Sequence, residues 1–339
     1  MKVTILGAGS WGVAIAKLLT ENHHEVTVWS VDPAEVAMLT EFCEQKQKLP
    51  GVILPGTVHF TCDAENALKE AEMVVMAVPS PFVRSTAVRV APYIREGITV
   101  VSVSKGIEEG TLKRLSQVLA EEIPQAKIAV LSGPSHAEEV GKLMPTTVVV
   151  GADSIEVAAA VQDAFMTDFF RVYTSPDVVG IELGGALKNV IALAAGIADG
   201  LGCGDNTKAA LITRGIVEIT DLGVKMGGHP ATFSGLSGIG DLIVTCASRH
   251  SRNRKAGFLI GQGMNADEAM NEVKMVVEGV YSAKAALELA KQKDVCMPIV
   301  EVVNQVLFEN LSAAEALKKL ITRDKKREVS ALLWDTEEE

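Results

Sequence analysis

The sequence has few cysteines, and they show no pairing pattern. The five cysteines, at positions 43, 62, 203, 246 and 296, are odd in number and never form a Cys-x-x-Cys pair. A disulfide framework or a structural zinc site requires regular, closely spaced cysteines, and the six histidines also lack metal-ligand spacing. The sequence therefore predicts no metal site, and it is typical of a protein of the reducing cytoplasm.

Basic residues are scarce relative to acidic ones. The chain of 339 residues has 32 Lys and Arg against 43 Asp and Glu, which gives a formal net charge of -11. Such a charge repels polyanions at long range, so nucleic acids and anionic membranes are not expected partners. A local basic pocket for a small anion remains compatible with this charge.

Long hydrophobic runs are missing as well. The longest apolar stretch that we expect to be helical, Val190–Ala198, is far shorter than the roughly 20 residues of a membrane span. The apolar run Val3–Ala16 superficially resembles a short signal peptide. We reject that interpretation because cleavage would remove the glycine motif described below, and we expect no membrane insertion.

The chain does have enough apolar residues, 48% of the total, to build about two domains. Up to about residue 175, short β-branched runs alternate with longer amphipathic segments. This alternation predicts an α/β fold with a doubly wound parallel sheet that helices cover on both faces. The predicted strands are Lys2–Leu6, Glu25–Trp29, Met73–Val78, Thr99–Val103, Lys127–Leu131, Thr146–Val150 and Phe169–Tyr173.

After about residue 180 the pattern changes to helical spacing in Ala-, Leu-, Gly- and Met-rich sequence. Leu183, Leu187, Val190 and Ile191, for example, fall on one face of a helix. We therefore expect an α/β domain over residues 1–178, an all-helical domain over residues 179–333 and a solvated acidic tail over residues 334–339.

A glycine motif, Gly7-Ala8-Gly9-Ser10-Trp11-Gly12, directly follows the first predicted strand and opens a helix. In such a turn the first glycine makes the bend, the second lets the backbone approach a pyrophosphate, and the third lets helix and strand pack closely. The helix N-terminus adds free N–H groups. A glycine-rich turn without a ligand is the alternative, which the strand-turn-helix context disfavours. The motif predicts binding of NAD or NADP.

Asp32 lies about 20 residues after Gly12, where an acidic side chain can bind the adenosine ribose of NAD. The segment Asp32-Pro33-Ala34-Glu35 also has the features of a helix start, with Asp32 as the N-cap, Pro33 at the first helical position and Glu35 reaching back. We favour the capping interpretation over ribose binding.

Segments with polar residues, two of them with a glycine, stand at the ends of three further predicted strands, at the edge where ligands of open α/β sheets bind. They are Val78-Pro79-Ser80, Ser104-Lys105-Gly106 and Ser132–Ala137. Plain loops are the alternative for each, and we favour that alternative for the first segment. Lys105 favours a ligand-binding role over a plain loop, because it follows a buried strand and adjoins a glycine that leaves room for a ligand.

Lys188 lies within the otherwise apolar segment Gly184–Ile191. A surface lysine that extends to solvent is the usual explanation, but apolar residues on both sides favour a lysine in a pocket. Burial there, or a second cation such as Lys105 nearby, would lower the pKa of Lys188 and let it act as a neutral base.

A carboxylate and a cluster of cations follow later in the chain. Asp241 lies in Gly238–Leu242, and the segment Ser248–Arg254 combines arginines with Ser and Asn. Guanidinium groups donate two parallel hydrogen bonds to phosphate or carboxylate, so in an acidic protein this cluster favours an anionic ligand. An exposed basic loop is the alternative. We assign no catalytic role to His136.

Taken together, these segments resemble the NAD(P)-dependent glycerol-3-phosphate dehydrogenase family, in particular its bacterial type. The resemblance covers nearly the whole chain, and the order of the motifs makes it specific. The motifs are Gly7–Gly12, Ala77–Ser80, Ser104–Glu108, Leu131–Val140, Gly185–Asn206, Gly240–Cys246, Ser251–Arg254 and Val277–Val280.

The resemblance implies a Rossmann-type dinucleotide-binding domain followed by a helical substrate-binding and catalytic domain. It also implies reversible hydride transfer between sn-glycerol 3-phosphate and NAD(P)+, giving dihydroxyacetone phosphate and NAD(P)H. The reaction would supply glycerol 3-phosphate for glycerophospholipid synthesis. The partner would be a small phosphorylated substrate, and a homodimer is expected.

The resemblance also assigns roles to residues. Lys188 would accept the proton, with Lys105 and Asp241 as further catalytic residues. The residues expected to bind the substrate are Lys105, Gly133, Ser135, Lys188, Asp241, Ser251, Arg252 and Asn253. Those expected to bind the cofactor are Gly7, Gly9, Ser10, Trp11, Gly12, Lys105, Ala137, Arg252, Val276 and Glu278.

One position departs from the family pattern. Bacterial members often carry Arg or His just after the second strand, where it meets the 2′-phosphate of NADP. This sequence has Val31 there, preceded by Ser30. The resemblance favours NADPH and Val31 weakens that preference, so NAD and NADP both remain candidates.

The sequence is compatible with two other functions. A 3-hydroxyacid dehydrogenase could be built from the same two types of domain, although the Ser-Arg-Asn-Arg segment 251–254 favours a phosphate over a carboxylate. A catalytically silent NAD(P)-binding sensor is the second alternative, and a pocket lysine at Lys188 argues against it.

Overall fold

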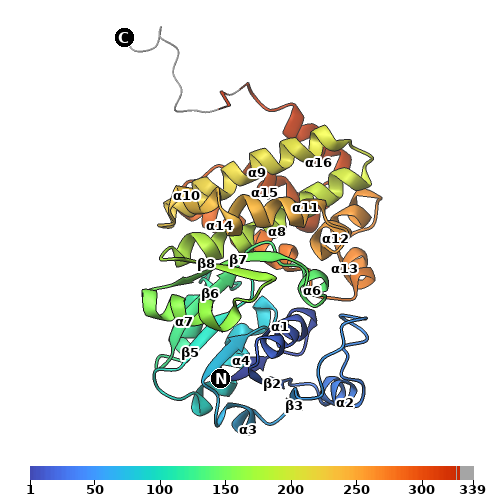
Figure 1. Cartoon of the computed structure of the whole chain (residues 1–339). Helices are drawn as coiled ribbons and strands as arrows, with labels where there is room; N and C mark the ends of the chain where they lie inside the picture. Colours follow the sequence, from blue (N-terminus) through green and yellow to red (C-terminus); the bar gives the residue numbers. More distant parts are fainter. Residues whose placement is uncertain (326, 329–339) are drawn as a thin grey trace.

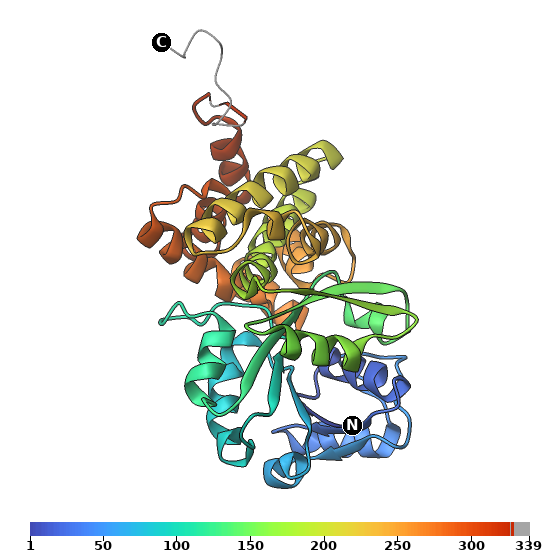
Figure 2. The same cartoon turned by 60° about the vertical axis from the view of Figure 1, so that its left-hand side comes forward.

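The structure is a computed structural model that describes residues 1–325, 327 and 328. The expected acidic tail, residues 334–339, lies outside the described residues. Figures 1 and 2 show a lower half built around a β-sheet and an upper half built from helices.

The sheet has eight strands in the order β3-β2-β1-β4-β5-β6-β7-β8. Strands β1 to β5 are parallel and have the strand order of doubly wound folds. The chain adds β2 and β3 on one side of β1 and then adds β4 and β5 on the other side. The strands are β1 (Lys2–Leu6), β2 (Glu25–Trp29), β3 (His59–Thr61), β4 (Met73–Met76), β5 (Thr99–Ser102), β6 (Lys127–Ser132), β7 (Thr146–Ala152) and β8 (Phe170–Ser175).

The prediction of a parallel sheet is correct for every pair except β6 and β7, which run antiparallel. Parallel neighbours need a crossover connection of a dozen or more residues, usually with a helix along the sheet. The β6–β7 connection contains only the single-turn helix α6 (Ala137–Val140) and stays at the carboxyl edge of the sheet. The short edge strand β3 was not predicted.

Helices cover both faces of the sheet because neighbouring side chains of each strand point to opposite sides. Val3 and Ile5 of β1 pack into the core under α1 and α7, whereas Leu6 packs into the core under α3, α4 and α5. The helices of this half are α1 (Ser10–Glu21), α2 (Pro33–Phe42), α3 (Ala64–Leu68), α4 (Val83–Val90), α5 (Leu115–Glu122) and α7 (Ile155–Phe165), with short 3-10 turns η1 (Ser80–Phe82) and η2 (Ala91–Tyr93).

The helical half is arranged around α8 (Val178–Gly200), whose residues are buried from Gly180 to Ala198. Figure 1 shows α8 surrounded by the later helices. They are α9 (Asp205–Lys225), α10 (Pro230–Phe233), α11 (Asp241–Ala247), α12 (Arg252–Gly261), α13 (Ala266–Val273), α14 (Glu278–Lys293), α15 (Pro298–Phe308) and α16 (Ala313–Ile321), with the π-type turn η3 (Leu236–Gly240) before α11.

Helix α8 corrects one expectation from the sequence. The apolar stretch was expected to be far too short to span a membrane, but α8 has 23 residues and is long and apolar enough by length and composition. Its apolar window is 89% buried inside the protein. The helix therefore serves as the core of the helical half.

Polar contacts join the two halves. Glu182 of α8 accepts hydrogen bonds from the backbone N–H of Ser116, at 2.8 Å, and from Arg114, at 2.6 Å, at the start of α5. Because Glu182 is only 7% exposed, these donors satisfy a buried carboxylate.

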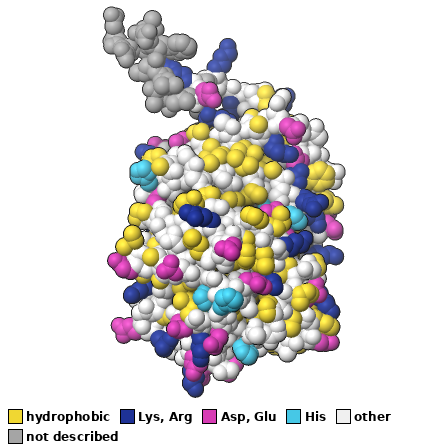
Figure 3. Space-filling view, viewed as in Figure 1, with side chains coloured by type: hydrophobic (Ala, Val, Ile, Leu, Met, Phe, Trp, Pro, Cys, Tyr) yellow, Lys and Arg dark blue, Asp and Glu magenta, His cyan; other side chains and the backbone are white. Residues whose placement is uncertain are grey.

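On the face shown in Figure 3, acidic and basic side chains are interspersed.

Candidate active site

A cleft of about 990 Å3 lies between the two halves, at the carboxyl ends of β1, β2, β4 and β5. This is the edge at which open α/β sheets bind their ligands. The helical half closes the cleft with residues of α8, of the start of α12 and of the α13–α14 connection.

The structure brings the predicted site residues together in this cleft. Thirteen of them line it, namely Gly7, Gly9, Ser10, Trp11, Lys105, Ser135, Ala137, Lys188, Ser251, Arg252, Asn253, Val276 and Glu278. The other three, Gly12, Gly133 and Asp241, do not line it but contact residues that do.

The glycine turn has the shape that a pyrophosphate requires. Gly7 has φ +119°, and a Cβ atom there would lie 2.9 Å from the carbonyl oxygen of Ala77. A Cβ on Gly12 would lie 2.0 Å from the carbonyl oxygen of Gly7, whereas one on Gly9 would meet nothing within 4 Å. Gly9 also caps α1 without a side-chain hydrogen bond. The turn thus leaves open space beside a helix N-terminus, which fits a dinucleotide.

The end of β2 confirms the capping interpretation of Asp32. Its side chain accepts a hydrogen bond from the backbone N–H of Ala34 at 2.9 Å, and Pro33 begins α2. Glu35 does not reach back to Asp32 as expected. The Glu35 carboxylate instead accepts hydrogen bonds from Ser30 Oγ, at 2.7 Å, and from Lys48 Nζ.

A buried carboxylate bridges two lysines at the centre of the cleft. Lys105 Nζ lies 2.6 Å from Asp241 Oδ2 and donates to the carbonyl oxygen of Gly133 at 2.9 Å. Lys188 Nζ donates to Asp241 Oδ1 and, at 2.8 Å, to the Thr245 hydroxyl. Lys188 is 5% exposed and Asp241 is 1% exposed. Burial to this degree excludes a surface lysine that extends to solvent.

This burial sets the charges of the cluster. Burial lowers the pKa of Lys188 to about 7, with Asp241 opposing the shift and Lys105 adding to it. Burial alone would raise the pKa of Asp241, but Lys105 and Lys188 together hold it below its ordinary range. Lys188 therefore exchanges a proton near neutral pH while Asp241 stays charged.

The segment Ser248–Arg254 is only partly an exposed loop: Arg249 is exposed in a turn, whereas α12 begins at Arg252. Ser251 caps the helix by accepting from the backbone N–H of Arg254 at 3.2 Å, and Arg254 pairs with Asp199 at 2.7 Å. Ser251 and Asn253 are buried, at 4% and 8% exposed. Arg252 lines the cleft, and its guanidinium donates to the carbonyl oxygen of Val276 at 3.2 Å.

The segment Val78-Pro79-Ser80, interpreted above as a plain loop, connects the two halves. Glu278 at the start of α14 accepts hydrogen bonds from Ser80, through the backbone N–H at 3.1 Å and through the hydroxyl. Burial raises the pKa of Glu278, and the two Ser80 donors oppose that shift. The contact holds the cofactor end of the cleft against the helical half.

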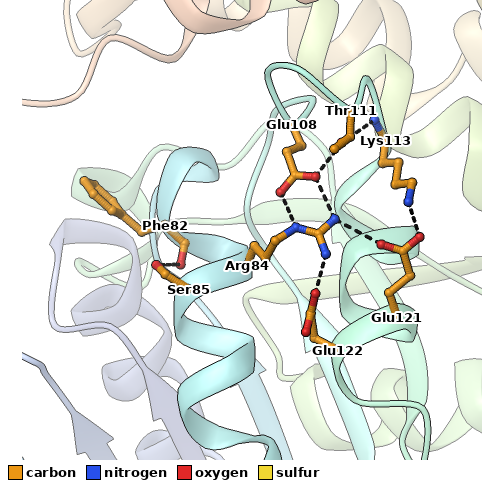
Figure 4. A network of polar contacts seen from close by, with 8 residues as sticks. All are labelled: Phe82, Arg84, Ser85, Glu108, Thr111, Lys113, Glu121 and Glu122. Atoms are coloured by element: carbon orange, nitrogen blue, oxygen red, sulfur yellow. Dashed lines mark hydrogen bonds and ion pairs between the residues drawn. The ribbon is translucent and has the colours of Figure 1, made fainter.

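A salt-bridge network fixes the segment that carries Lys105 (Figure 4). Arg84 of α4 donates to both oxygens of Glu108 at 2.7 Å, and also contacts Glu121, at 3.0 Å, and Glu122 of α5. Glu108 is the last residue of the Ser104–Glu108 motif, so its contact with Arg84 ties this motif to α4. Bidentate Arg–carboxylate contacts restrict a loop more strongly than single ion pairs.

Asn189 and Thr245 line the cleft but were not singled out from the sequence. Asn189 accepts a hydrogen bond from Asn253 at 2.9 Å, and Thr245 accepts from Lys188. Thr245 lies four residues after Asp241 on α11, a spacing that places both side chains on one helix face and could have revealed it. His136 is mostly buried, and burial lowers its pKa to about 4 with a contribution from Lys188, so its imidazole is neutral.

Comparisons with known proteins agree with this geometry. The family models described as NAD-dependent glycerol-3-phosphate dehydrogenase N-terminus and C-terminus match residues 2–158 and 177–318. Curated relatives named glycerol-3-phosphate dehydrogenase (NAD(P)+) include one from Agathobacter rectalis, 61% identical over 98% of this chain and 99% of the relative. Another, from Fusobacterium nucleatum, is 54% identical over 98% of this chain and 99% of the relative.

A solved structure supports the same relationship. The glycerol-3-phosphate dehydrogenase of Coxiella burnetii superimposes with a TM-score of 0.92 at 34% sequence identity, covering 95% of this chain and 99% of that one. Identity of this level over nearly the full length, together with both family models, establishes the family. This chain belongs to the NAD(P)-dependent glycerol-3-phosphate dehydrogenase family.

Proposed function

We propose that the protein is an oxidoreductase of the cytoplasm that transfers hydride reversibly between sn-glycerol 3-phosphate and NAD(P)+, giving dihydroxyacetone phosphate. The observation that carries this proposal is the Lys188–Asp241–Lys105 cluster, which shares one cleft with the glycine turn and Arg252. The names of the relatives support the choice of substrate. Its physiological use would be to supply glycerol 3-phosphate for glycerophospholipid synthesis.

The glycine turn and the residues around it would hold the cofactor. The backbone at Gly9, Ser10 and Trp11 would receive the pyrophosphate, since the α1 N-terminus offers N–H groups there. Ala137, Val276 and Glu278 line the same cleft farther along. When bound, the nicotinamide supplies or accepts the hydride.

Lys188 would move the proton of the reacting hydroxyl. In the oxidation direction its neutral amine takes the C2 hydroxyl proton, and in the reduction direction its ammonium form returns a proton to the C2 oxygen. A pKa of about 7 lets both forms be populated at neutral pH. Asp241 would orient Lys188 and tune its charge, because it accepts a hydrogen bond from Lys188 directly. Lys105 would act on Lys188 through the same carboxylate.

Arg252 and its neighbours would anchor the phosphate of the substrate. Arg252 lines the cleft together with Ser251 and Asn253 of the helical half and Ser135 of the β6–β7 connection. The side chains of Ser251 and Asn253 already make internal hydrogen bonds, so Arg252 would carry most of the electrostatic attraction. An anchored phosphate makes the reaction effectively intramolecular.

The test is the initial rate of dihydroxyacetone phosphate reduction by the purified protein, with NADH and NADPH side by side. Unphosphorylated dihydroxyacetone and a 3-oxoacid serve as control substrates. We expect turnover of the phosphorylated substrate far above both controls. Faster turnover of the 3-oxoacid would favour a 3-hydroxyacid dehydrogenase, and tight cofactor binding without turnover would favour a cofactor sensor.

We further propose that the protein acts as a homodimer, as the family resemblance implies. Light scattering of the purified chain measures the mass in solution. A mass of one chain at assay concentrations would contradict this part of the proposal.

A further inference from the structure

Two cations at the far end of the cleft have no part in the reaction proposed above. Arg89 of α4 and Lys48 of the α2–β3 connection line the cleft together with Ser30 and Val31, which follow β2. Dinucleotide folds place the adenosine ribose at the end of this strand. The charges of this end therefore act on the cofactor and not on the substrate.

Arg89 is presented to the cleft by the geometry of α4 and the turn before it. Phe82, Ser85 and Arg89 are separated by three and four residues, so they lie on one helical face, and all three line the cleft. The Arg89 guanidinium carbon lies 5.6 Å from the ring centroid of Trp29, the last residue of β2. This cation–π contact holds the guanidinium beside the strand end.

Arg89 is exposed, and in the part of the chain that the structure describes no acidic side chain pairs with it. Arg252, the other arginine that lines the cleft, donates to the carbonyl oxygen of Val276 at 3.2 Å and lies at the start of α12 in the helical half. A guanidinium that lines a ligand cleft without an acidic partner can bind two oxygens of a phosphate or carboxylate through parallel hydrogen bonds.

Lys48 neutralises a partly buried carboxylate at this end, that of Glu35. The Glu35 side chain is 14% exposed and contacts Lys48, while Ser30 Oγ donates to it at 2.7 Å. Gln45, which also donates to the backbone oxygen of Ala8 at 3.0 Å, lies 3.5 Å from it. Three donors therefore surround Glu35, and its charge is balanced before any ligand arrives.

We propose that Arg89 binds the 2′-phosphate of NADP(H), and that Lys48, by neutralising Glu35, removes the repulsion that this phosphate would otherwise meet. The inference rests on the proposed function for the use of NAD(P). It explains how a chain with Val31 after β2 can still accept NADP(H), because the positive charge comes from α4, where Arg89 lies beside Trp29 at the end of β2. The structure thus favours NADPH over NADH.

The test compares NADPH with NADH in binding to Arg89→Gln. Binding is measured without substrate, from the fluorescence of the reduced nicotinamide, and the KM of each cofactor is measured with dihydroxyacetone phosphate. A lost charge-assisted contact predicts at least about a 10-fold weaker affinity for NADPH. We expect the affinity for NADH to change by no more than about twofold, since NADH lacks the phosphate.

The matched control is Lys46→Gln. Lys46 also follows α2 and is exposed, but its Nζ lies 2.9 Å from the ring centroid of Phe42 and it does not line the cleft. We expect Lys46→Gln to bind both cofactors as the unmodified protein does. Equal losses for NADPH and NADH in Arg89→Gln, or no loss for either, would overturn the proposal.

The role of Lys48 has its own test. Lys48→Gln leaves Glu35 unbalanced, so we expect it to weaken NADPH more than NADH, and the double variant Lys48→Gln/Glu35→Gln to recover the NADPH affinity. A double variant as weak as the single one would show that Lys48 does not act through Glu35. An unmodified protein that binds NADH at least as tightly as NADPH would overturn the whole inference.

Failure here differs from failure of the proposed reaction. The fluorescence titration contains no substrate, so a selective NADPH loss in Arg89→Gln supports the inference even if dihydroxyacetone phosphate is not reduced. Turnover of dihydroxyacetone phosphate with unchanged cofactor selectivity would instead support the reaction and reject Arg89.

Discussion

The ammonium groups of Lys188 and Lys105 contact the two different oxygens of a single carboxylate, that of Asp241. One lysine comes from the core helix of the helical half and the other from the loop after β5 of the sheet. The proton affinity of Lys188 therefore depends on how the two halves are held together.

The first prediction concerns Lys188 itself. We expect Lys188→Ala to lower kcat by at least about 100-fold, because general acid–base catalysis by the amine is lost. Cofactor affinity in the fluorescence titration should be nearly unchanged. The exposed lysine of the same half, Lys255, offers a control in Lys255→Ala. Near-normal kcat in Lys188→Ala would refute the assignment.

The second prediction concerns pH. Because the pKa of Lys188 is about 7, kcat/KM for oxidation of glycerol 3-phosphate should rise as the pH increases through this value, and kcat/KM for the reduction should fall. Lys105→Met removes a cation that lowers the pKa of Lys188, so the profile should move to higher pH. A profile that stays in place in Lys105→Met would show that Lys105 does not influence the proton of Lys188.

The third prediction concerns the phosphate anchor. Arg252→Ala should raise KM for dihydroxyacetone phosphate by roughly 10-fold or more, since charged hydrogen bonds contribute about 1.5–3 kcal/mol. The weak turnover of unphosphorylated dihydroxyacetone should change much less. Lys255→Ala, three residues along α12, is the matched control. Equal losses for both substrates would place Arg252 outside the phosphate site.

Much of the sheet could be predicted from the sequence. Strands β1 and β2 begin and end where expected because their apolar runs are bounded by clear helix and turn signals. The antiparallel β6–β7 pair could not be predicted, since a buried strand does not encode the direction of its neighbour. That direction follows from the connection, which stays on one edge and lines the cleft.

The site was partly predictable for a similar reason. Local sequence was enough to place Lys188 in a pocket, because its neighbours require burial. Its partner Asp241 lies 53 residues away on another helix, and only packing of α8 against α11 brings the two together. Likewise, nothing near Arg89 in the sequence indicates that it lines the same cleft as Val31.

The fourth prediction concerns stability. The Glu218 carboxyl accepts hydrogen bonds from the backbone N–H groups of Ile299, at 2.9 Å, and Val300, at 3.3 Å, at the start of α15, and it is only 5% exposed. Burial raises the pKa of Glu218 to about 7, whereas the unfolded chain has the ordinary value of 4.5. The folded state therefore binds more protons between these pH values.

The free energy of unfolding should accordingly fall as the pH rises from 4.5 to about 7, by roughly 3 kcal/mol at most from this group. Glu218→Gln keeps an acceptor for both N–H groups and cannot titrate. Urea unfolding at several pH values should show a smaller fall for Glu218→Gln than for the unmodified protein. Parallel pH dependences would contradict the raised pKa.

The most direct test of the proposed reaction is to follow the hydride itself. Dihydroxyacetone phosphate is reduced with NADPH in which both hydrogens at C4 of the nicotinamide are deuterium, and the product is examined by NMR. The account predicts sn-glycerol 3-phosphate with deuterium at C2 in the unmodified protein and almost none formed by Lys188→Ala. Product without the label at C2, or no product from the unmodified protein, would contradict it.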